Sequence, residues 1–330
     1  MHGWLVVLFL TISSTNALRT FDPSAPYYGP RLAPGDCLIA RAGDWGLGSQ
    51  IVHLVHAVVN VGKTKLFWDF GDSPYQCCPV NETCSNNGWS TLFDGPVPTS
   101  LPDVHNANDT AASFLDPRTN QQIECMRWGL LEVADFNHFL YNASAFGCHS
   151  LCESLLEIWR PSPTIGLIID YEMGTLHVYP RPHIAIQVRG GDKIGDEVNP
   201  YVLDKTIETM ALDIRNHNGT CIILGDDFNL GQEAIRLAQK HLNCFVINRL
   251  EPGYAHDQHK FNSQTRISRC LRTKRLLVDI EMLAQADNSI SLVISNVGRI
   301  ATLLQYCRKG VTNMLDWEGR DVLKEACNPF

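Results

Sequence analysis

Short apolar runs alternate with longer amphipathic stretches through the second half of the chain. The apolar runs are typical of buried strands, and the stretches with apolar positions three and four apart are typical of helices. Strands are expected at 183–188, 221–224, 244–247 and 289–294, and helices at 201–216, 230–241, 272–286 and 297–306. This alternation predicts a parallel sheet with helices packed on its faces.

The first half has a strand–helix–strand pattern followed by a long polar region. Residues 37–40 and 64–68 are expected to form strands, and a glycine turn and a helix at 51–61 lie between them. The stretch 71–122 is rich in Pro, Asn, Asp, Ser and Gly, which favours long loops over regular elements. Residues 127–159 have mostly helical spacing, and the prolines that follow should end that helix.

Length and composition indicate a folded α/β protein of two domains. The 330 residues exceed one typical core of roughly 100–200 residues. A hydrophobic content of 45% with 19% charged residues is ordinary for a globular protein, and we place the domain boundary between Pro161 and Pro182. The net charge of -8 argues against a nucleic-acid-binding surface, so an anionic ligand must be held by a few well-placed cations.

Residues 1–17 have the pattern of a cleaved signal peptide. An apolar run from Trp4 to Leu10 precedes a short polar stretch that ends at Ala17. The run is shorter than the ~20 apolar residues that a membrane-spanning helix needs, and no later segment is longer. We therefore expect no stable membrane span, and a mature chain that resides in the lumen of the secretory pathway (Golgi or ER) or is secreted.

The cysteines and glycosylation sequons fit that compartment. The chain has 12 cysteines, an even count that predicts disulfides without specifying their pairing. A zinc site at Cys77, Cys78 and Cys84 is the alternative, but that group lacks a C-x2-C pair. N-glycosylation sequons lie in polar surroundings at Asn81, Asn108, Asn142 and Asn218.

The segment 183–198 has the clearest candidate chemistry. Its apolar strand continues directly into Arg189, Asp192, Lys193 and Glu197, and open parallel sheets bind ligands at the carboxyl ends of their strands. A guanidinium group can contact two oxygens of a leaving diphosphate at once, which makes Arg189 the candidate anion-binding group. The alternative is a solvated turn after a strand.

This segment resembles the V-H-V-R-R-T-D-K-V-G-T-E-A motif of the core α-1,6-fucosyltransferases, a family that includes the Nod-factor fucosyltransferases. The matching positions are Arg189, Asp192, Lys193, Gly195 and Glu197. Further matches follow in order: G-L-G-S-Q at 46–50, G-W-S-T-L-F at 88–93, G-D-D at 225–227, L-V-D-I-E-M-L-A-Q-A-D at 277–287 and S-N-V-G-R-I-A at 295–301.

The resemblance implies a two-domain GT-B-like glycosyltransferase that moves fucose from GDP-fucose to a hydroxyl of a glycan or glycoprotein with inversion. It implies an N-terminal α/β acceptor-side domain with disulfide-rich loops at 18–165 and a Rossmann-like GDP-sugar-binding domain at 166–330. It implies no metal cofactor, and the D-x-D spacing of metal-using glycosyltransferases does not occur in the sequence.

By this resemblance Arg189 binds the pyrophosphate, and Glu197 is the general base with Lys193 as its charge partner. A structural ion pair between Lys193 and Glu197 is the alternative. The expected donor-binding residues are Gly46, Gly48, Gln187, Arg189, Asp192, Asp226, Asp227, Asp279, Ser295 and Asn296.

Several of these residues have a structural alternative. The two aspartates at 226 and 227 precede a predicted helix and are suited to capping it, as are Ser295 and Asn296. Asp279 lies within a predicted amphipathic helix and can instead be an acid of a buried network. The histidines at 256 and 259 have helical metal-ligand spacing but no third ligand, which favours a polar loop.

Three positions depart from the family pattern. This chain has Gly190 where the family has a second arginine, Gln187 where it has a histidine, and Leu47 where it has a tyrosine. Two other functions therefore remain open: a sugar- or nucleotide-binding protein without turnover, and a transferase for a different nucleotide sugar.

Overall fold

The structure is a computed structural model of the chain, and it describes fourteen stretches of it. They are 37–41, 46–61, 66–70, 73–77, 88–94, 111–115, 122–128, 148–178, 181–193, 207–208, 219–242, 244–292, 295–309 and 314–315. The predicted signal peptide at 1–17, Glu197 and the sequon asparagines all lie outside these stretches.

Four strands of the first half form one sheet. They are β1 (Cys37–Arg41), β2 (Leu66–Asp69), β3 (Ala111–Leu115) and β4 (Gln122–Trp128), in the order β2-β1-β4-β3. Strand β1 is parallel to β2 and to β4, whereas β3 is antiparallel to β4. Helix α1 (Leu47–Val61) connects β1 to β2, which confirms the predicted strand–helix–strand unit.

The polar region of the first half contains more regular structure than the sequence predicts. Helix α2 (Trp89–Leu92) and strand β3 lie within 71–122, where only loops were expected, and β4 occupies 127–128, where a helix was expected. The two missed strands have a common physical reason. The β3–β4 pair and the placement of β4 beside β1 are pairings between separate segments, which local periodicity does not encode.

The second half forms a sheet in which every pair of neighbouring strands is parallel, as predicted. Its strands are β5 (Ile184–Val188), β6 (Gly219–Gly225), β7 (Cys244–Asn248), β8 (Asn288–Leu292) and β9 (Met314–Leu315). Their order is β7-β6-β5-β8-β9. The chain therefore starts at the central strand β5, moves outward to β7, and then returns to the other side of β5.

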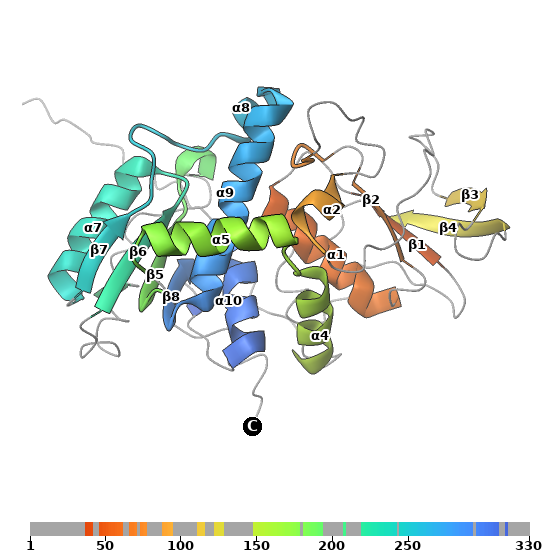
Figure 1. Cartoon of the computed structure of the whole chain (residues 1–330). Helices are drawn as coiled ribbons and strands as arrows, with labels where there is room; N and C mark the ends of the chain where they lie inside the picture. The colour runs from red at the N-terminus through yellow and green to blue at the C-terminus, as the bar shows by residue number, and fades with distance from the viewer. Residues whose placement is uncertain are drawn as a thin grey trace, which may run out of the picture.

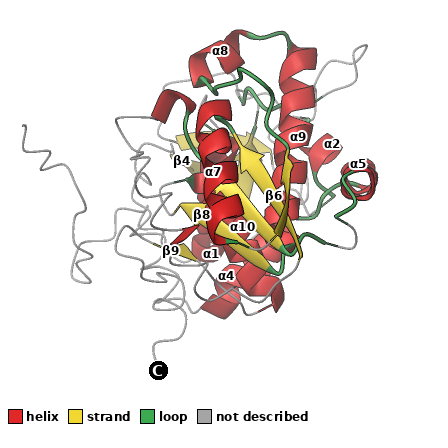
Figure 2. Ribbon diagram, turned by 90° about the vertical axis from the view of Figure 1, so that its left-hand side faces the viewer, coloured by secondary structure: helices red, strands yellow, loops and turns green. Residues whose placement is uncertain are grey.

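Helices cover both faces of this sheet. Helix α7 (Phe228–His241) packs on one face, and α9 (Arg266–Gln285) and α10 (Asn296–Lys309) pack on the other, as Figures 1 and 2 show. Alternate residues of β5 point to opposite faces, so Ile184, Ile186 and Val188 pack with α7 while Ala185 joins the core on the other side. These helices confirm the predictions at 230–241, 272–286 and 297–306.

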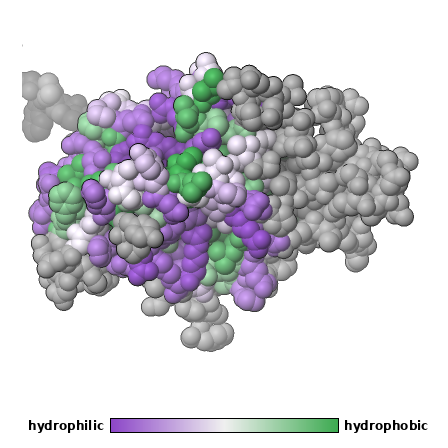
Figure 3. All heavy atoms as spheres, in the orientation of Figure 1, coloured by the Kyte–Doolittle hydropathy of each residue, from purple (hydrophilic) through white to green (hydrophobic). Residues whose placement is uncertain are grey.

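Two helices connect the halves. Helix α4 (Cys148–Ile158) ends before the prolines, as predicted, and α5 (Pro163–Thr175) was not predicted. Ser162 caps α5 by accepting the Ile165 N–H at 3.4 Å, and proline at the first helical position needs no N–H partner. Helix α5 packs against α9, and its Leu167 is 72% exposed. Figure 3 shows the molecule in the orientation of Figure 1, with hydrophobic residues lying among hydrophilic ones on this face.

One apolar core runs through both halves of the chain. It includes Leu54 of α1, Leu155 of α4, Leu283 of α9 and Leu304 of α10, and these helices lie between the two sheets in Figure 1. Two disulfides, Cys77–Cys270 and Cys152–Cys307, also connect the halves, and Cys221–Cys244 joins β6 to β7. The prediction of disulfides is confirmed, while the domain limits at 165 and 166 stay a prediction.

Candidate functional site

The candidate site lies at the carboxyl end of β5. The strand order reverses between β5 and β8, and open parallel sheets bind ligands in the crevice outside the carboxyl ends of the strands at such a reversal. Arg189 directly follows β5, Asp226 directly follows β6, and Ser295 precedes α10 close after β8. The fold therefore brings together three groups that the sequence separates by up to 106 residues (295 − 189 = 106).

The Arg189 guanidinium is held by two carboxylates. One terminal nitrogen forms an ion pair with Oδ2 of Asp226, and the other lies 3.3 Å from Oδ1 of Asp192. The other carboxylate oxygen of Asp226 accepts the Gly190 N–H at 2.8 Å. Only 17% of the Arg189 side chain is exposed, and its two carboxylate partners orient the guanidinium without a ligand.

Asp227 has a structural role in this arrangement. Its Oδ1 accepts the Leu230 N–H at 2.9 Å and so caps α7, and its Oδ2 accepts the Gly191 N–H at 3.0 Å. The side chain is buried, and both of its oxygens are used. The capping alternative is therefore observed for Asp227, which ties the loop after β5 to the start of α7.

The loop after β5 leaves no room for larger side chains. A Cβ at Gly190 would lie 2.5 Å from Cβ of Asp227, and a Cβ at Gly191 would lie 2.2 Å from the His256 carbonyl oxygen. Gly191 also has a φ of 60°, which favours glycine. The missing second arginine at Gly190 thus has a packing reason: that position is filled by the cap of α7.

The segment 254–258 supports the same loop from the other side. The His256 N–H donates to the Asp226 carbonyl at 2.8 Å, and the Asp192 N–H donates to the His256 carbonyl at 2.8 Å. The Gln258 N–H donates to Oδ2 of Asp192 at 3.1 Å. The sequence predicts a polar loop at 256–259, but residues 258 and 259 begin the short helix α8 (Gln258–Ser263), which Asp257 caps by accepting the Lys260 N–H at 3.0 Å. The bond between Gln258 and Asp192 joins residues 66 positions apart, and a local pattern carries no signal for such a contact.

The beginnings of α1 and α10 meet beside β5. Gln187 donates from Nε2 to Oγ of Ser295 at 2.7 Å, and that oxygen accepts the Gly298 N–H at 3.3 Å as the cap of α10. Asn296 donates to Oγ of Ser49 at 2.6 Å. A Cβ at Gly48 would lie 2.8 Å from the Val297 nitrogen, so glycine permits this close approach. Helix N-termini favour anions, and two of them converge here.

Asp279 lies in a separate charged network. It pairs with Nε of Arg249 at 2.6 Å, and Arg249 also pairs with Glu172 of α5. Burial raises the pKa of Asp279, while Arg249 acts in the opposite direction. The contacts of Asp279 match the buried-network alternative, and none of them is with Arg189 or its partners.

The remaining predicted site residues are placed only in part. Gly46 precedes α1, and a Cβ there would lie 3.9 Å from Oε1 of Gln258 and 4.0 Å from the Tyr75 hydroxyl. Lys193 ends the short helix Gly191–Lys193 and only its backbone is described, whereas Glu197 lies outside the described residues. Among the residues that the structure describes, no group of three or more His, Cys, Asp or Glu side chains is arranged to hold a metal ion.

Comparison with known proteins gives matches among solved structures. No protein-family model matches the chain, and no curated protein matches it. A mutant of Arabidopsis thaliana FUT1 in complex with GDP is 12% identical, with 86% of this chain and 70% of that chain covered and a TM-score of 0.46. The fucosyltransferase NodZ from Bradyrhizobium is 13% identical, with 82% and 94% covered and a TM-score of 0.46.

A NodZ alpha-1,6-fucosyltransferase soaked with GDP-fucose is 14% identical, with 82% and 92% covered and the same TM-score. These structures are fucosyltransferases. At this identity and TM-score, we draw no conclusion from the similarity about the activity of this chain or the roles of its residues. Both are argued from the sequence motif and from the geometry of the site. Within the described stretches, no helix is both long and apolar enough to cross a membrane.

Proposed function

We propose that this chain is a metal-independent glycosyltransferase that transfers fucose from GDP-fucose to a hydroxyl of a glycan or glycoprotein, with inversion and in the manner of the α-1,6-fucosyltransferases. We place it in the lumen of the Golgi or ER, or outside the cell. The proposed architecture is GT-B-like, with a Rossmann-like donor domain at 166–330. One observation carries the proposal: Arg189 stands at the carboxyl end of the central strand, where the strand order reverses.

The surroundings of the Arg189 guanidinium suit the binding of a diphosphate. Two carboxylates orient the Arg189 guanidinium, and the Gln187–Ser295 hydrogen bond holds the N-terminus of α10 beside the same strand. When the bond between sugar and diphosphate breaks, negative charge develops on the diphosphate. A bidentate guanidinium contact stabilises that charge. The partial positive charge at the N-terminus of α10 stabilises it further.

Asp192 and Asp226 are proposed to have different roles when a diphosphate binds to Arg189. In the described arrangement they neutralise the guanidinium, and the 3.3 Å contact with Asp192 is the longer of the two. We infer that the diphosphate replaces Asp192 first, while Asp226 keeps the loop in place through the Gly190 N–H. Glu197 is proposed to take the proton of the acceptor hydroxyl, with Lys193 as its charge partner.

The test is a thermal-shift panel of GDP, UDP, GDP-fucose and GDP-mannose, since a ligand of the folded state raises its stability with ln(1 + [L]/Kd). GDP and GDP-fucose should stabilise the protein, and Arg189→Ala should abolish the shift. Arg236→Ala is the matched control, because Arg236 forms a comparable fork with Glu233 on the exposed face of α7. Stabilisation by UDP but not by GDP would contradict the proposal that GDP-fucose is the donor.

Transfer is measured as GDP release from GDP-fucose in the presence of a panel of glycans. One observation favours a binding protein as the second candidate: the family's second arginine is replaced by Gly190, where a Cβ would lie 2.5 Å from Cβ of Asp227. GDP binding without transfer to any glycan would support that candidate. Release that depends on an added glycan would support the transferase.

A further inference from the structure

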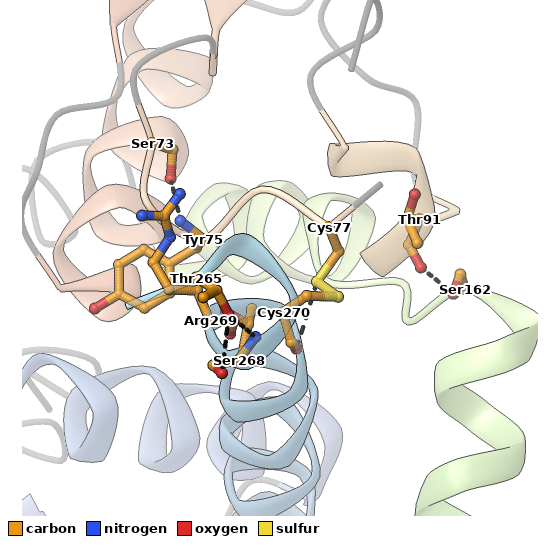
Figure 4. Close-up of a disulfide and its surroundings, with 10 residues drawn as sticks. Ser73, Tyr75, Cys77, Thr91, Ser162, Thr265, Ser268, Arg269 and Cys270 are labelled. Carbon is orange, nitrogen blue, oxygen red and sulfur yellow. Dashed lines mark hydrogen bonds between the residues drawn. A yellow bond between two sulfur atoms is a disulfide. The ribbon is translucent and has the colours of Figure 1, made fainter. Parts of the chain in front are cut away.

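We propose that the Cys77–Cys270 disulfide positions Arg189, acting through Tyr75, Gln258 and Asp192. The disulfide joins the first half of the chain to α9, and Figure 4 shows it linking the segment 73–77 to that helix. The inference rests on the proposed function for its catalytic consequence only. The structural part concerns contacts that exist without a donor.

The first step leads from the disulfide to Tyr75. Tyr75 lies two residues before Cys77 and is buried, with its ring stacked on Phe261 at a centroid distance of 4.7 Å. The Tyr75 N–H bonds to Oγ of Ser73 at 3.2 Å, and Ser73 donates to Oε1 of Gln50 in α1 at 2.8 Å. The segment 73–77 thus contacts both α1 and the helix Gln258–Ser263 (α8), and the disulfide joins it to α9.

The second step leads from Tyr75 to Gln258. The Tyr75 hydroxyl donates to Oε1 of Gln258 at 3.0 Å. Burial raises the pKa of Tyr75 to about 12, so the phenol stays protonated and remains a donor at neutral pH. Oε1 also lies 3.3 Å from Nε2 of His256, and the Gln258 amide donates to Asn262 at 2.8 Å. These bonds fix the orientation of the Gln258 side chain.

The third step leads from Gln258 to Arg189. The backbone N–H of Gln258 donates to Oδ2 of Asp192 at 3.1 Å, and Oδ1 of the same carboxylate lies 3.3 Å from the Arg189 guanidinium. A shift of Gln258 therefore shifts Asp192, which is the partner that the diphosphate is proposed to replace. Asp192 and Gln258 act here as positioning residues.

The disulfide adds a covalent constraint to contacts that are individually modest. A typical net hydrogen bond or stacked aromatic pair is worth on the order of 1 kcal/mol, and residues 73–77 form no helix or strand. Gly88 packs directly on Cys77, where a Cβ would lie 2.6 Å from the Cys77 nitrogen. Together these constraints hold Tyr75 against Gln258.

The chain offers a matched control in the second disulfide between the halves. Cys152–Cys307 joins α4 to α10, and Cys307 lies roughly 16 Å along α10 from the end that carries Asn296. The two disulfides close loops of similar size, with sequence separations of 193 and 155. Because the entropic effect depends on the logarithm of loop length, their removal should affect the unfolded state almost equally.

The experiment compares Cys77→Ser/Cys270→Ser with Cys152→Ser/Cys307→Ser in the full chain. Hydrogen–deuterium exchange of peptides that cover 187–193 and 254–260 is followed without nucleotide. We expect faster exchange of both peptides in the first variant and wild-type exchange in the second. GDP affinity should fall about tenfold in the first variant and stay unchanged in the second. Equal exchange and equal GDP affinity in the two variants would overturn the proposal.

Tyr75→Phe removes only the hydroxyl and leaves the disulfide in place. It should raise exchange at 254–260 and weaken GDP binding severalfold, but should add little in the background that lacks Cys77–Cys270, because both changes break the same path. Hydrogen–deuterium exchange at 254–260 that stays at the wild-type rate in Tyr75→Phe would contradict the proposed path from the disulfide to Arg189. Fully additive effects of Tyr75→Phe and loss of the disulfide would contradict it as well. If exchange responds as expected while no nucleotide stabilises the wild type, the proposed function fails and the positioning role stands.

Discussion

At the scale of single residues, the site depends on how one arginine is held. Arg189 has a planar fork of donors, and its partners Asp226 and Asp192 already engage both ends of that fork. The orientation of the group is therefore fixed by the fold. Lysine cannot reproduce this geometry, because its ammonium group is a point charge on a flexible stem.

We expect Arg189→Lys to lower GDP-fucose turnover by about a hundredfold or more while the protein stays folded. Loss of one preorganised contact with developing charge costs roughly 3 kcal/mol in the barrier. The measurement is GDP release with an acceptor glycan, run beside circular dichroism. Arg236→Lys, in the exposed pair on α7, should keep wild-type turnover. Normal turnover in Arg189→Lys would refute the role of the fork.

Glu197 provides a second test at this scale. If Glu197 is the general base, Glu197→Gln should reduce the transfer rate by the factor of ~10²–10⁴ that is typical of acid–base catalysis. GDP binding should remain almost unchanged. A purely structural pair with Lys193 would have only a mild effect on turnover. Transfer rate and GDP affinity are measured on the same preparations. Near-wild-type transfer would move the search for the base to Asp192 and Asp196.

A substitution at Gly190 tests whether packing explains the absence of the second arginine of the family motif. Introducing arginine by Gly190→Arg restores the family residue, but the new side chain would collide with Asp227 and Leu230. We expect a loss of about 1–3 kcal/mol of folding stability and no gain in turnover. Chemical denaturation measures the first and GDP release the second. Higher turnover with unchanged stability would show that the loop after β5 can rearrange.

At the scale of elements, a buried carboxylate joins three helices. Glu281 of α9 accepts two bonds from Arg308 of α10 at 2.8 and 2.9 Å, and one at 2.5 Å from the Trp159 indole just after α4. Burial alone would raise the pKa of Glu281, but Arg308, Trp159 and Gln285 outweigh it, and the pKa lies below the ordinary 4.5. The charged form is therefore favoured in the folded state.

This lowered pKa determines the sign of the pH dependence. The contribution of Glu281 is present above the ordinary value of 4.5 and is lost as the pH falls through the folded-state pKa. We expect Glu281→Gln to cost about 3 kcal/mol near pH 7, since it leaves Arg308 without its carboxylate, and to flatten the loss of stability toward acid pH. Urea unfolding at several pH values measures both.

The control for Glu281 is Glu233→Gln in the solvent-exposed pair with Arg236, which should leave the unfolding midpoint near pH 7 unchanged. An equal loss of stability in both variants would mean that burial of the Glu281 pair does not matter. An unchanged acid profile in Glu281→Gln would assign the acid sensitivity to other groups.

At the scale of the whole molecule, the two sheets are joined by a shared core and by two disulfides. The candidate site is assembled from both halves, because Ser49 of α1 bonds to Asn296 of α10 and Tyr75 bonds to Gln258. The activity should therefore belong to the intact chain, and separate halves should not bind GDP.

The proposed metal independence is also tested on the intact chain. We expect transfer to survive saturating EDTA, because the proposed charge stabilisation comes from Arg189 and helix N-termini. Rates are compared in EDTA, in buffer and with added Mn²⁺. A complete loss in EDTA that Mn²⁺ restores would require a metal site and would overturn this part of the proposal.

The sequence alone determined the parallel sheet of the second half and the residue types at the end of β5. Strands such as 221–224 are short apolar runs, and helices such as 230–241 have a clear apolar stripe, so local periodicity specifies them. The motif around Arg189 was visible because its residues are neighbours along the chain. The disulfide chemistry followed from cysteine content, but the pairing did not.

Only the tertiary structure decided which of these residues act together. The placement of β4 beside β1 and the network of Asp279 depend on partners far away in sequence, and a local pattern contains no information about such partners. Asp226 and Asp227 look equivalent in the sequence, yet one pairs with Arg189 and the other caps α7. The physical reason is that hydrogen bonds depend on position in space, and positions in space are set by packing of the whole chain.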